Sequence, residues 1–147
     1  MPCSTPAGCV FETAHQKWIA GDLEGFLAQF DDNIVWHVNI DGLSVPYAAS
    51  AVGVEDLRWR LQHMMDTFSI DRFAVEWITH GAQSCRSSVH IVYVHRATGE
   101  PLDVKLRFIG WQHDGRLVRM EEQADAAYVE AYSRFVHHLE TSREGAP

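Results

Sequence analysis

The sequence predicts an α+β fold: a cone-shaped, strongly curved antiparallel sheet wrapped over three N-terminal helices, with a further helix at the C-terminus. Apolar residues first recur at helical spacing, and after Ser69 the spacing changes to the period of two that is typical of strands. Consecutive strands joined by short turns form an antiparallel meander rather than parallel β-α-β units. The open end of such a cone is a natural pocket.

The helices are predicted from their apolar faces and from the residues that interrupt them. The first starts at Cys9 and ends at Gly21, and Asp22 is a good N-cap for the second. The third follows Gly53, and 126–140 is amphipathic and predicts the C-terminal helix. The apolar faces of the first three helices consist of Val10, Phe11, Ala14 and Trp18, of Leu23, Phe26, Leu27 and Phe30, and of Val54, Leu57, Leu61, Met64, Met65 and Phe68.

Strands are predicted at 34–38, 73–80 and 87–96, and on both sides of Asp114-Gly115. This dipeptide is a strong signal for a tight two-residue hairpin turn. If the turn sets the register, the facing pairs are His113 with Arg116, Trp111 with Val118, Ile109 with Met120, and Arg107 with Glu122. These side chains would share one face, an apolar wall that ends in a charge pair, as a small-molecule pocket requires. Either face of the hairpin could be the concave one.

Composition limits the domain organisation and the classes of partner. A chain of 147 residues with 46% hydrophobic content suits one domain at 9–140, with flexible tails at 1–8 and 141–147. A net charge of -8 argues against a nucleic-acid surface. No apolar run reaches the length of a membrane span and no signal peptide is evident, so a cytoplasmic location is expected. The odd number of cysteines predicts no disulfide framework.

Several short segments are similar, in order and spacing, to those of a known family. They are WIAGDLE at 18–24, DNIVW at 32–36, VPY at 45–47 with Gly53, Thr98-Gly99, DGRL at 114–117 and EQAD at 122–125. Over roughly residues 9–135 the chain resembles the SnoaL-like branch of the nuclear transport factor 2-like (ketosteroid isomerase-like) superfamily, whose fold is also called cystatin-like. The resemblance implies a cone-shaped pocket, frequent homodimers, no obligatory cofactor, and isomerase, dehydratase, cyclase or epoxide hydrolase activities. Relatives commonly carry an aromatic residue where this chain has Gln123.

Four residues are candidates for catalysis. Glu122 beside Arg107 in a dry pocket would stay ionised and could take a proton, or the two form an exposed cross-strand salt bridge. Asp125 matches the terminal aspartate of the family pattern, which implies an acid or base; alternatively it caps the final helix. His37 titrates near neutrality and could polarise a carbonyl, or it lies at the rim of the pocket.

Further residues are candidates for contacting a ligand. Tyr47 could donate a hydrogen bond to an oxyanion, and Asn39 shares a strand face with His37. The remaining predicted contacts are apolar: Trp18, Phe26, Met64, Ile109, Trp111 and Met120. The nine histidines show no metal-ligand spacing and no glycine-rich phosphate loop occurs, so neither a metal nor a cofactor is expected.

Two hypotheses for function follow. The first is a cofactor-independent enzyme of the isomerase, dehydratase, cyclase or hydrolase type, acting by general acid/base catalysis on a small hydrophobic molecule in an enclosed pocket. The alternative is a non-catalytic ligand-binding or dimerisation module of the same fold, with Arg107 and Glu122 as a structural pair. Both hypotheses expect a small hydrophobic ligand and a homodimer, and neither involves nucleic acid or a membrane.

Overall fold

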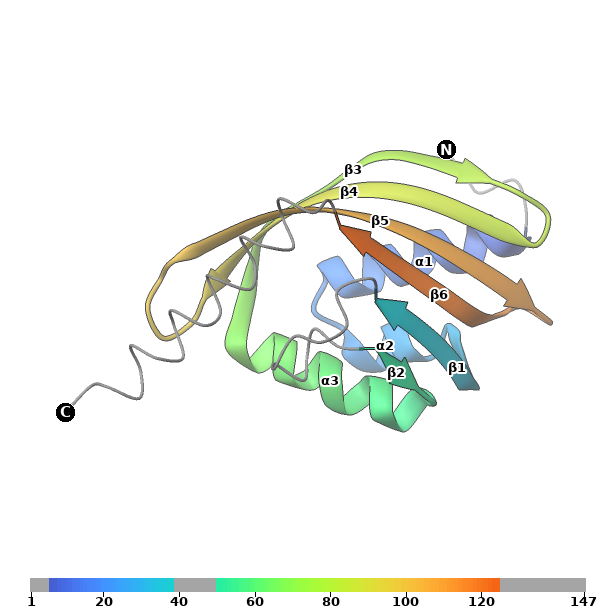
Figure 1. Cartoon of the computed structure of the whole chain (residues 1–147), viewed down its shortest axis with the longest axis horizontal. Coiled ribbons are helices and arrows are strands. Elements are labelled where there is room, and N and C mark those ends of the chain that lie inside the picture. The colour runs from blue at the N-terminus through green and yellow to red at the C-terminus, as the bar shows by residue number, and fades with distance from the viewer. Residues whose placement is uncertain (1–5, 39–49, 125–147) are drawn as a thin grey trace.

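The computed structural model describes residues 6–38 and 50–124, which form three helices and a six-stranded sheet. The elements are α1 (Pro6–Ile19), α2 (Leu23–Leu27), β1 (Phe30–Val38), β2 (Ala51–Val52), α3 (Val54–Thr67), β3 (Phe68–His80), β4 (Ser84–His95), β5 (Pro101–His113) and β6 (Arg116–Ala124). Figure 1 shows the sheet curling over the helices. The predicted α+β fold is confirmed, and the predicted helix at 126–140 lies outside the described residues.

The strand order is β2-β1-β6-β5-β4-β3. Strands β3 to β6 form the antiparallel meander that the sequence predicts. By contrast, β1 runs parallel to β6, and the short β2 pairs antiparallel with β1. The sheet is therefore mixed rather than wholly antiparallel. The β1–β6 pair joins segments that are far apart in the sequence, so local patterns could not reveal it.

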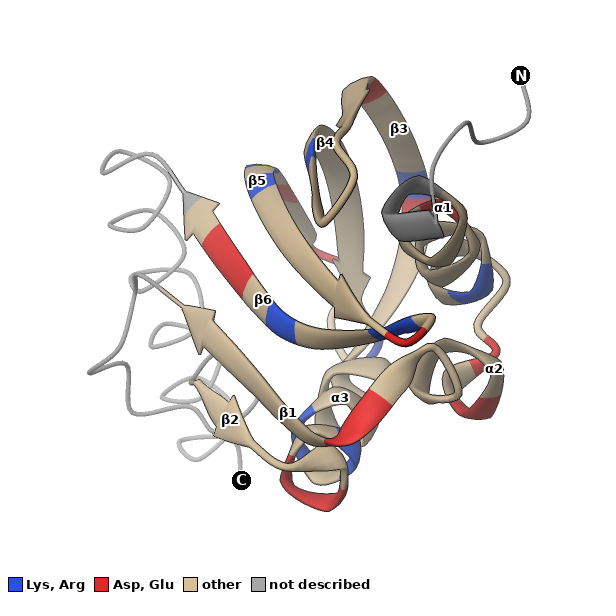
Figure 2. Ribbon diagram, turned by 90° about the vertical axis from the view of Figure 1, so that its right-hand side faces the viewer, with Lys and Arg blue, Asp and Glu red and all other residues tan. Residues whose placement is uncertain are grey.

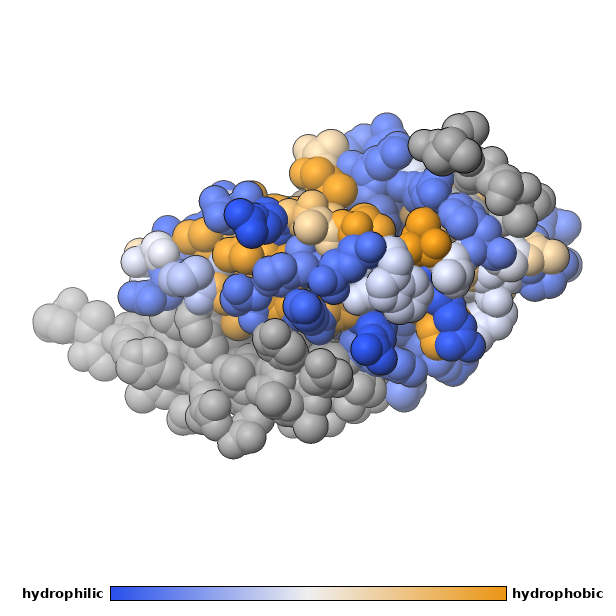
Figure 3. Space-filling model, turned by 90° about the horizontal axis from the view of Figure 1, so that it is seen from above, coloured by the Kyte–Doolittle hydropathy of each residue, from blue (hydrophilic) through white to orange (hydrophobic). Residues whose placement is uncertain are grey.

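The two faces of the sheet differ in burial. The inner face, which packs on the helices, carries buried side chains, among them Trp36, Val38, Val89, Ile91, Tyr93, Val104, Phe108 and Met120. The outer face carries the intervening positions, including the exposed Lys105 and Arg107. Seen from above, the molecule presents a mixture of hydrophilic and hydrophobic side chains (Figure 3). Val75 and Trp77 on the edge strand β3 are 42% and 45% exposed.

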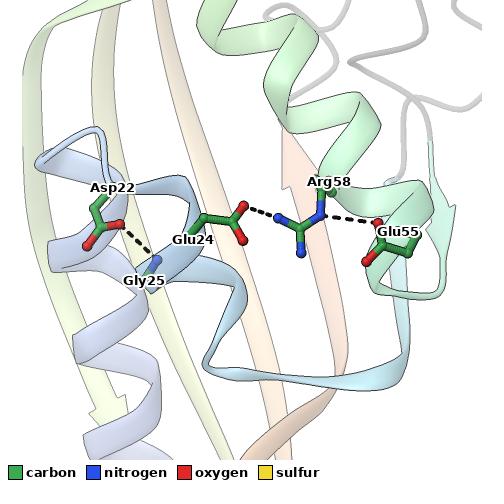
Figure 4. A network of polar contacts seen from close by, with 5 residues as sticks. All are labelled: Asp22, Glu24, Gly25, Glu55 and Arg58. Atoms are coloured by element: carbon green, nitrogen blue, oxygen red, sulfur yellow. Dashed lines mark hydrogen bonds and ion pairs between the residues drawn. The ribbon is translucent and has the colours of Figure 1, made fainter.

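The predicted N-cap and an ion-pair network fix the short helix α2. The Asp22 carboxylate accepts a hydrogen bond from the Gly25 backbone N–H at 2.9 Å, as an N-cap does. Glu24 pairs with Arg58 of α3, and the Arg58 Nε donates to Glu55 at 3.2 Å (Figure 4). These contacts tie α2 to α3 on the surface of the helical layer.

Some local expectations fail where tertiary contacts or covalent bonds override the pattern. Helix α1 begins at Pro6, earlier than the apolar spacing indicates. That spacing places Phe30 on the second helix, but α2 ends at Leu27, and Phe30 is instead the buried first residue of β1. Cys9 is disulfide-bonded, although the odd number of cysteines predicts no disulfide framework, and Cys85 is buried.

A β-bulge changes the predicted register of the last hairpin. At the turn, Asp114 and Gly115 both have positive φ (50° and 78°), and His113 pairs with Arg116 as predicted. The register then shifts by one residue between Trp111 and Gln112. Beyond the shift the pairs are Trp111 with Arg119, Ile109 with Glu121, Phe108 with Glu122, and Arg107 with Gln123. The predicted pairs Trp111–Val118, Ile109–Met120 and Arg107–Glu122 are therefore wrong, because a one-residue shift moves side chains to the other face.

Candidate functional site

Glu122, near the end of β6, is an acid on the inner face of the sheet. Its partners in register are Phe108 of β5 and Val38 of β1, both buried. Figure 2 shows acidic residues near the end of β6, alongside β1. Desolvation by burial raises the pKa of Glu122 to about 7, against the opposing effect of a hydrogen bond with the Trp36 side chain. Both protonation states of this carboxyl group are therefore populated near neutral pH.

Tyr93 of β4 is a second polar group on this part of the inner face. Its hydroxyl oxygen accepts a hydrogen bond from the Trp18 indole N–H at 3.3 Å, and both side chains are buried. Desolvation by burial raises the pKa of Tyr93 well above its ordinary value, and the nearby charge of Glu122 raises it further, while the Trp18 hydrogen bond lowers it. The phenol therefore stays protonated and can donate a hydrogen bond.

Aromatic rings surround these two groups. The ring of Phe26 lies 5.4 Å from Trp18 and 6.2 Å from Trp36, measured between centroids. Trp36 in turn lies 6.1 Å from Phe108, and Met64 of α3 belongs to the same buried cluster. This shell of apolar atoms is the physical cause of the desolvation that shifts the pKa of Glu122.

Three residues of the predicted site lie on the outer face. Arg107, Ile109 and Trp111 alternate along β5 with inner-face positions such as the buried Phe108, and Arg107 is exposed. The Arg119 guanidinium lies 5.8 Å from the centre of the Trp111 ring, so this aromatic residue takes part in an outer-face contact. The bulge is the reason for the difference, and it separates Arg107 from Glu122.

His37 also lies on the outer face. The flanking Trp36 and Val38 are buried, whereas His37 is exposed and pairs in parallel register with Glu121. Its side chain and that of Glu122 therefore lie on opposite faces of the sheet. The predicted site residues that fall outside the described part of the chain are Asn39, Tyr47 and Asp125.

A second polar pair lies elsewhere on the inner face. His15 of α1 is buried, and its Nε2 lies 2.9 Å from the Ser87 hydroxyl oxygen on β4. The His15 ring lies 4.6 Å from Phe11 and 5.8 Å from Phe108. Desolvation by burial lowers the pKa of His15 to about 4, although a hydrogen bond with the Phe11 backbone raises it. His15 is therefore neutral at physiological pH.

Residues 6–38 and 50–124 contain neither a metal-binding cluster nor a membrane-spanning helix. In those ranges no group of three or more His, Cys, Asp or Glu side chains is arranged to hold a metal ion. None of the helices in the same ranges has the length and apolar character needed to cross a membrane. The pair of Glu122 and Tyr93 therefore stands out in the described part of the molecule.

Sequence comparison identifies the family. A model described as the SnoaL-like domain matches residues 11–120. The chain belongs to this family. No curated protein matches the sequence of this SnoaL-like domain.

Solved structures share the fold of this SnoaL-like domain at low sequence identity. A protein from Rhodopseudomonas palustris, provisionally described as an isomerase, is 20% identical with a TM-score of 0.70 over 82% of this chain and 89% of its own. TerC, co-crystallised with polyporic acid, is 14% identical with a TM-score of 0.74 over 88% and 98%. A computationally designed 17-OHP binder is 14% identical with a TM-score of 0.73 over 85% and 97%. These similarities establish the fold.

Tyr93 and Trp36 were missed as site residues by sequence reasoning. Tyr93 lies in the predicted strand 87–96, where Val89, Ile91 and Tyr93 alternate along one face. That alternation could have indicated a hydroxyl on the inner face of the SnoaL-like domain. The contact between Trp36 and Glu122 carried no such signal, because it depends on the parallel pairing of β1 with β6.

Proposed function

We propose that this SnoaL-like domain is a cofactor-independent enzyme that transfers protons on a small hydrophobic molecule, with Glu122 as the general acid/base. The observation that carries the proposal is a carboxyl group of pKa about 7 among buried aromatic side chains. A catalytic acid or base works best when its pKa lies near the operating pH. Strongly shifted pKa values also concentrate at functional sites.

The neighbouring groups suit such a reaction. The ionised Glu122 would take a proton from an atom next to a carbonyl or hydroxyl group of the ligand. The Tyr93 hydroxyl would donate a hydrogen bond to the ligand oxygen as negative charge develops there. Return of the proton from Glu122 to a different atom completes an isomerisation, and its delivery to a departing hydroxyl group completes a dehydration.

Some of the other predicted site residues remain candidates for a role in this reaction, and others do not. Asp125 remains a candidate for a second acid or base, and Asn39 and Tyr47 remain candidates for polar contacts with the ligand. Arg107 and His37 do not enter the mechanism, because they lie on the outer face. The structures of TerC with polyporic acid and of the 17-OHP binder support a ligand-binding role, because both have a similar fold.

Thermal shift against hydrophobic ketones, epoxides and aromatic acids would first find a ligand, since binding to the folded state raises the melting temperature. Turnover of each hit is then compared for the wild type, Glu122→Gln and Glu121→Gln. We expect Glu122→Gln to lose about 100-fold or more in kcat, the range expected for general acid/base catalysis. Glu121→Gln is the matched control, since Glu121 is the neighbouring carboxylate on the outer face. Full turnover by Glu122→Gln would contradict the proposal.

A second candidate function is a non-catalytic binding module. The similarity to a designed binder favours it, because that protein has this fold and is described only as a binder. In this case hits bind to the wild type and to Glu122→Gln with similar affinity, and no product forms with either protein. Product formation by the wild type alone excludes this alternative.

We propose in addition that the protein forms a homodimer through the outer face of the sheet. The exposed Trp77 on β3 pairs with Ser88 of β4, which pairs in turn with the outer-face Arg107, and a large apolar group on a surface favours association. Sedimentation velocity of the wild type and of Trp77→Ser tests this, with a dimer expected for the wild type and dissociation for the variant. A monomeric wild type would contradict it.

A further inference from the structure

We propose that Trp18 is a positioning residue: its indole N–H holds the Tyr93 hydroxyl oxygen, so that the hydroxyl proton points toward a ligand oxygen lying between Tyr93 and Glu122. The inference rests on the proposed function and names the kind of ligand atom that the site recognises. That atom is a hydrogen-bond acceptor, such as a carbonyl or hydroxyl oxygen.

The hydrogen-bonding capacities of the two side chains carry the first step. An indole N–H can only donate, whereas a phenol hydroxyl can donate its proton and also accept. Because the Tyr93 oxygen accepts from Trp18 at 3.3 Å, the Tyr93 proton must point away from the indole. The hydrogen bonds among residues 6–38 and 50–124 give this proton no acceptor. A buried donor is favourably satisfied by an acceptor, so a ligand oxygen in the direction of this proton would be bound well.

The position of Glu122 carries the second step. Its charge lies close enough to raise the pKa of Tyr93, yet the hydrogen bond acting on the Tyr93 hydroxyl comes from Trp18 and not from Glu122. A ligand oxygen that accepts from Tyr93 would therefore have Glu122 nearby, placed to exchange a proton with an adjacent ligand atom. Trp36 orients Glu122 by a hydrogen bond of the same kind.

The surroundings of Trp18 make it suitable for this role. Its side chain is only 8% exposed and its ring packs 5.4 Å from that of Phe26, so the indole has little freedom to turn. A donor held by packing fixes the direction of the group to which it donates. Trp59 on α3 is 50% exposed and provides a control tryptophan on a different surface.

The test is a pH titration of Glu122, monitored by the carbon-13 NMR signal of its carboxyl carbon. It is carried out on the wild type, Trp18→Phe, Tyr93→Phe, the double variant and the control Trp59→Phe. A hydroxyl proton pointing toward a carboxylate stabilises the charged form. We expect Trp18→Phe to raise the pKa of Glu122 by about half a unit, Tyr93→Phe by at least as much, and the double variant to match Tyr93→Phe alone. In the described part of the chain, other titratable groups on the inner side of the sheet include Cys85 of β4, His15 from α1 and His95 from β4, and the two histidines are hydrogen-bonded to Ser87 and Thr98.

Additive shifts in the double variant would overturn the inference, because Trp18 would then act on Glu122 without Tyr93. An unchanged titration in Trp18→Phe would overturn it as well, while the proposed function would stand. A pKa of Glu122 near its ordinary value in the wild type would contradict both this inference and the proposed function. If Trp18→Phe does not fold, the Raman difference spectrum between the wild type and Tyr93→Phe decides, since it reports whether the Tyr93 phenol accepts a hydrogen bond, as we expect, or only donates one.

Discussion

Glu122 and His15 are two titratable groups on the inner side of the same sheet, and Phe108 lies next to both. Its ring lies 5.8 Å from that of His15, and its strand position pairs with Glu122. Desolvation is the main cause of both pKa shifts, to about 7 for Glu122 and to about 4 for His15. Burial favours the neutral form, which is the protonated carboxyl but the deprotonated imidazole. The same environment therefore tunes the acid to neutral pH and makes the histidine inert there.

Replacing the residue shared by the two regions should give the largest effect. Phe108→Ala removes a buried ring and is expected to lower the free energy of unfolding by about 3 to 5 kcal/mol. If water enters the space, the pKa of Glu122 should fall toward its usual 4.5 and that of His15 should rise toward its usual 6.5. Urea unfolding measures the first effect and NMR titration measures the second. Unchanged pKa values in a folded variant would show that desolvation by Phe108 is not the cause.

Neutralising the acid should affect stability in a pH-dependent manner. The folded-state pKa of Glu122 is raised from 4.5 to about 7, so its contribution to stability is fully present below the unfolded value and is lost as the pH rises through the folded value. Glu122→Gln removes the charge, so we expect it to raise the free energy of unfolding by about 3 kcal/mol at about pH 8, since a difference of about 2.5 in pKa corresponds to about 1.4 kcal/mol for each unit, and to change it little at about pH 4.5. Urea unfolding at both pH values measures this difference.

Glu121→Gln serves as the control for this stability measurement, because Glu121 lies on the outer face beside Glu122. Its expected effect is within about 0.5 kcal/mol at either pH, as for most surface substitutions. Equal effects of the two substitutions would contradict the distinction between the faces. A stabilised but inactive Glu122→Gln would instead indicate that an acid kept for function lowers the stability of the fold.

The fold could be predicted from the sequence where local chemistry decides it. Asp22 caps α2, and Asp114-Gly115 forms the turn because both residues adopt positive φ. The bulge between Trp111 and Gln112 has no comparable local signal, since it places one extra residue in an otherwise regular alternation. An error of one residue was enough to exchange the two faces of the hairpin beyond that point.

The candidate site could be predicted only in part for the same reason. The sequence draws attention to Glu122 through a supposed pairing with Arg107, whereas the structure draws attention to it through its partly buried place on the inner face beside the buried Phe108 and Val38. The contact with Val38 depends on the long-range parallel pairing of β1 and β6, and that with Phe108 on the shifted register. Both are properties of the assembled sheet, which the spacing of residues along one strand does not contain.

The stability contributed by the histidine region should respond to pH in the opposite sense. The folded-state pKa of His15 is lowered from 6.5 to about 4, so its contribution to stability is present above the unfolded value and is lost as the pH falls through the folded value. His15→Leu removes this loss but leaves the buried Ser87 hydroxyl without its partner, at a cost of about 1 to 3 kcal/mol at neutral pH.

Adding Ser87→Ala to His15→Leu should restore most of that stability, because replacing both partners of a buried hydrogen bond by apolar groups can be nearly neutral. Urea unfolding of the wild type and the single and double variants at about pH 7 and about pH 4.5 separates the two effects. As the pH falls, we expect the wild type to lose the stability that His15 contributes. His15→Leu and the double variant should show no such loss. The pH-dependent contribution of Glu122 to stability should remain in all of these proteins. If the double variant is no more stable than His15→Leu alone, packing of the ring among Phe11 and Phe108, rather than its hydrogen bond, is what holds this side of the sheet to α1.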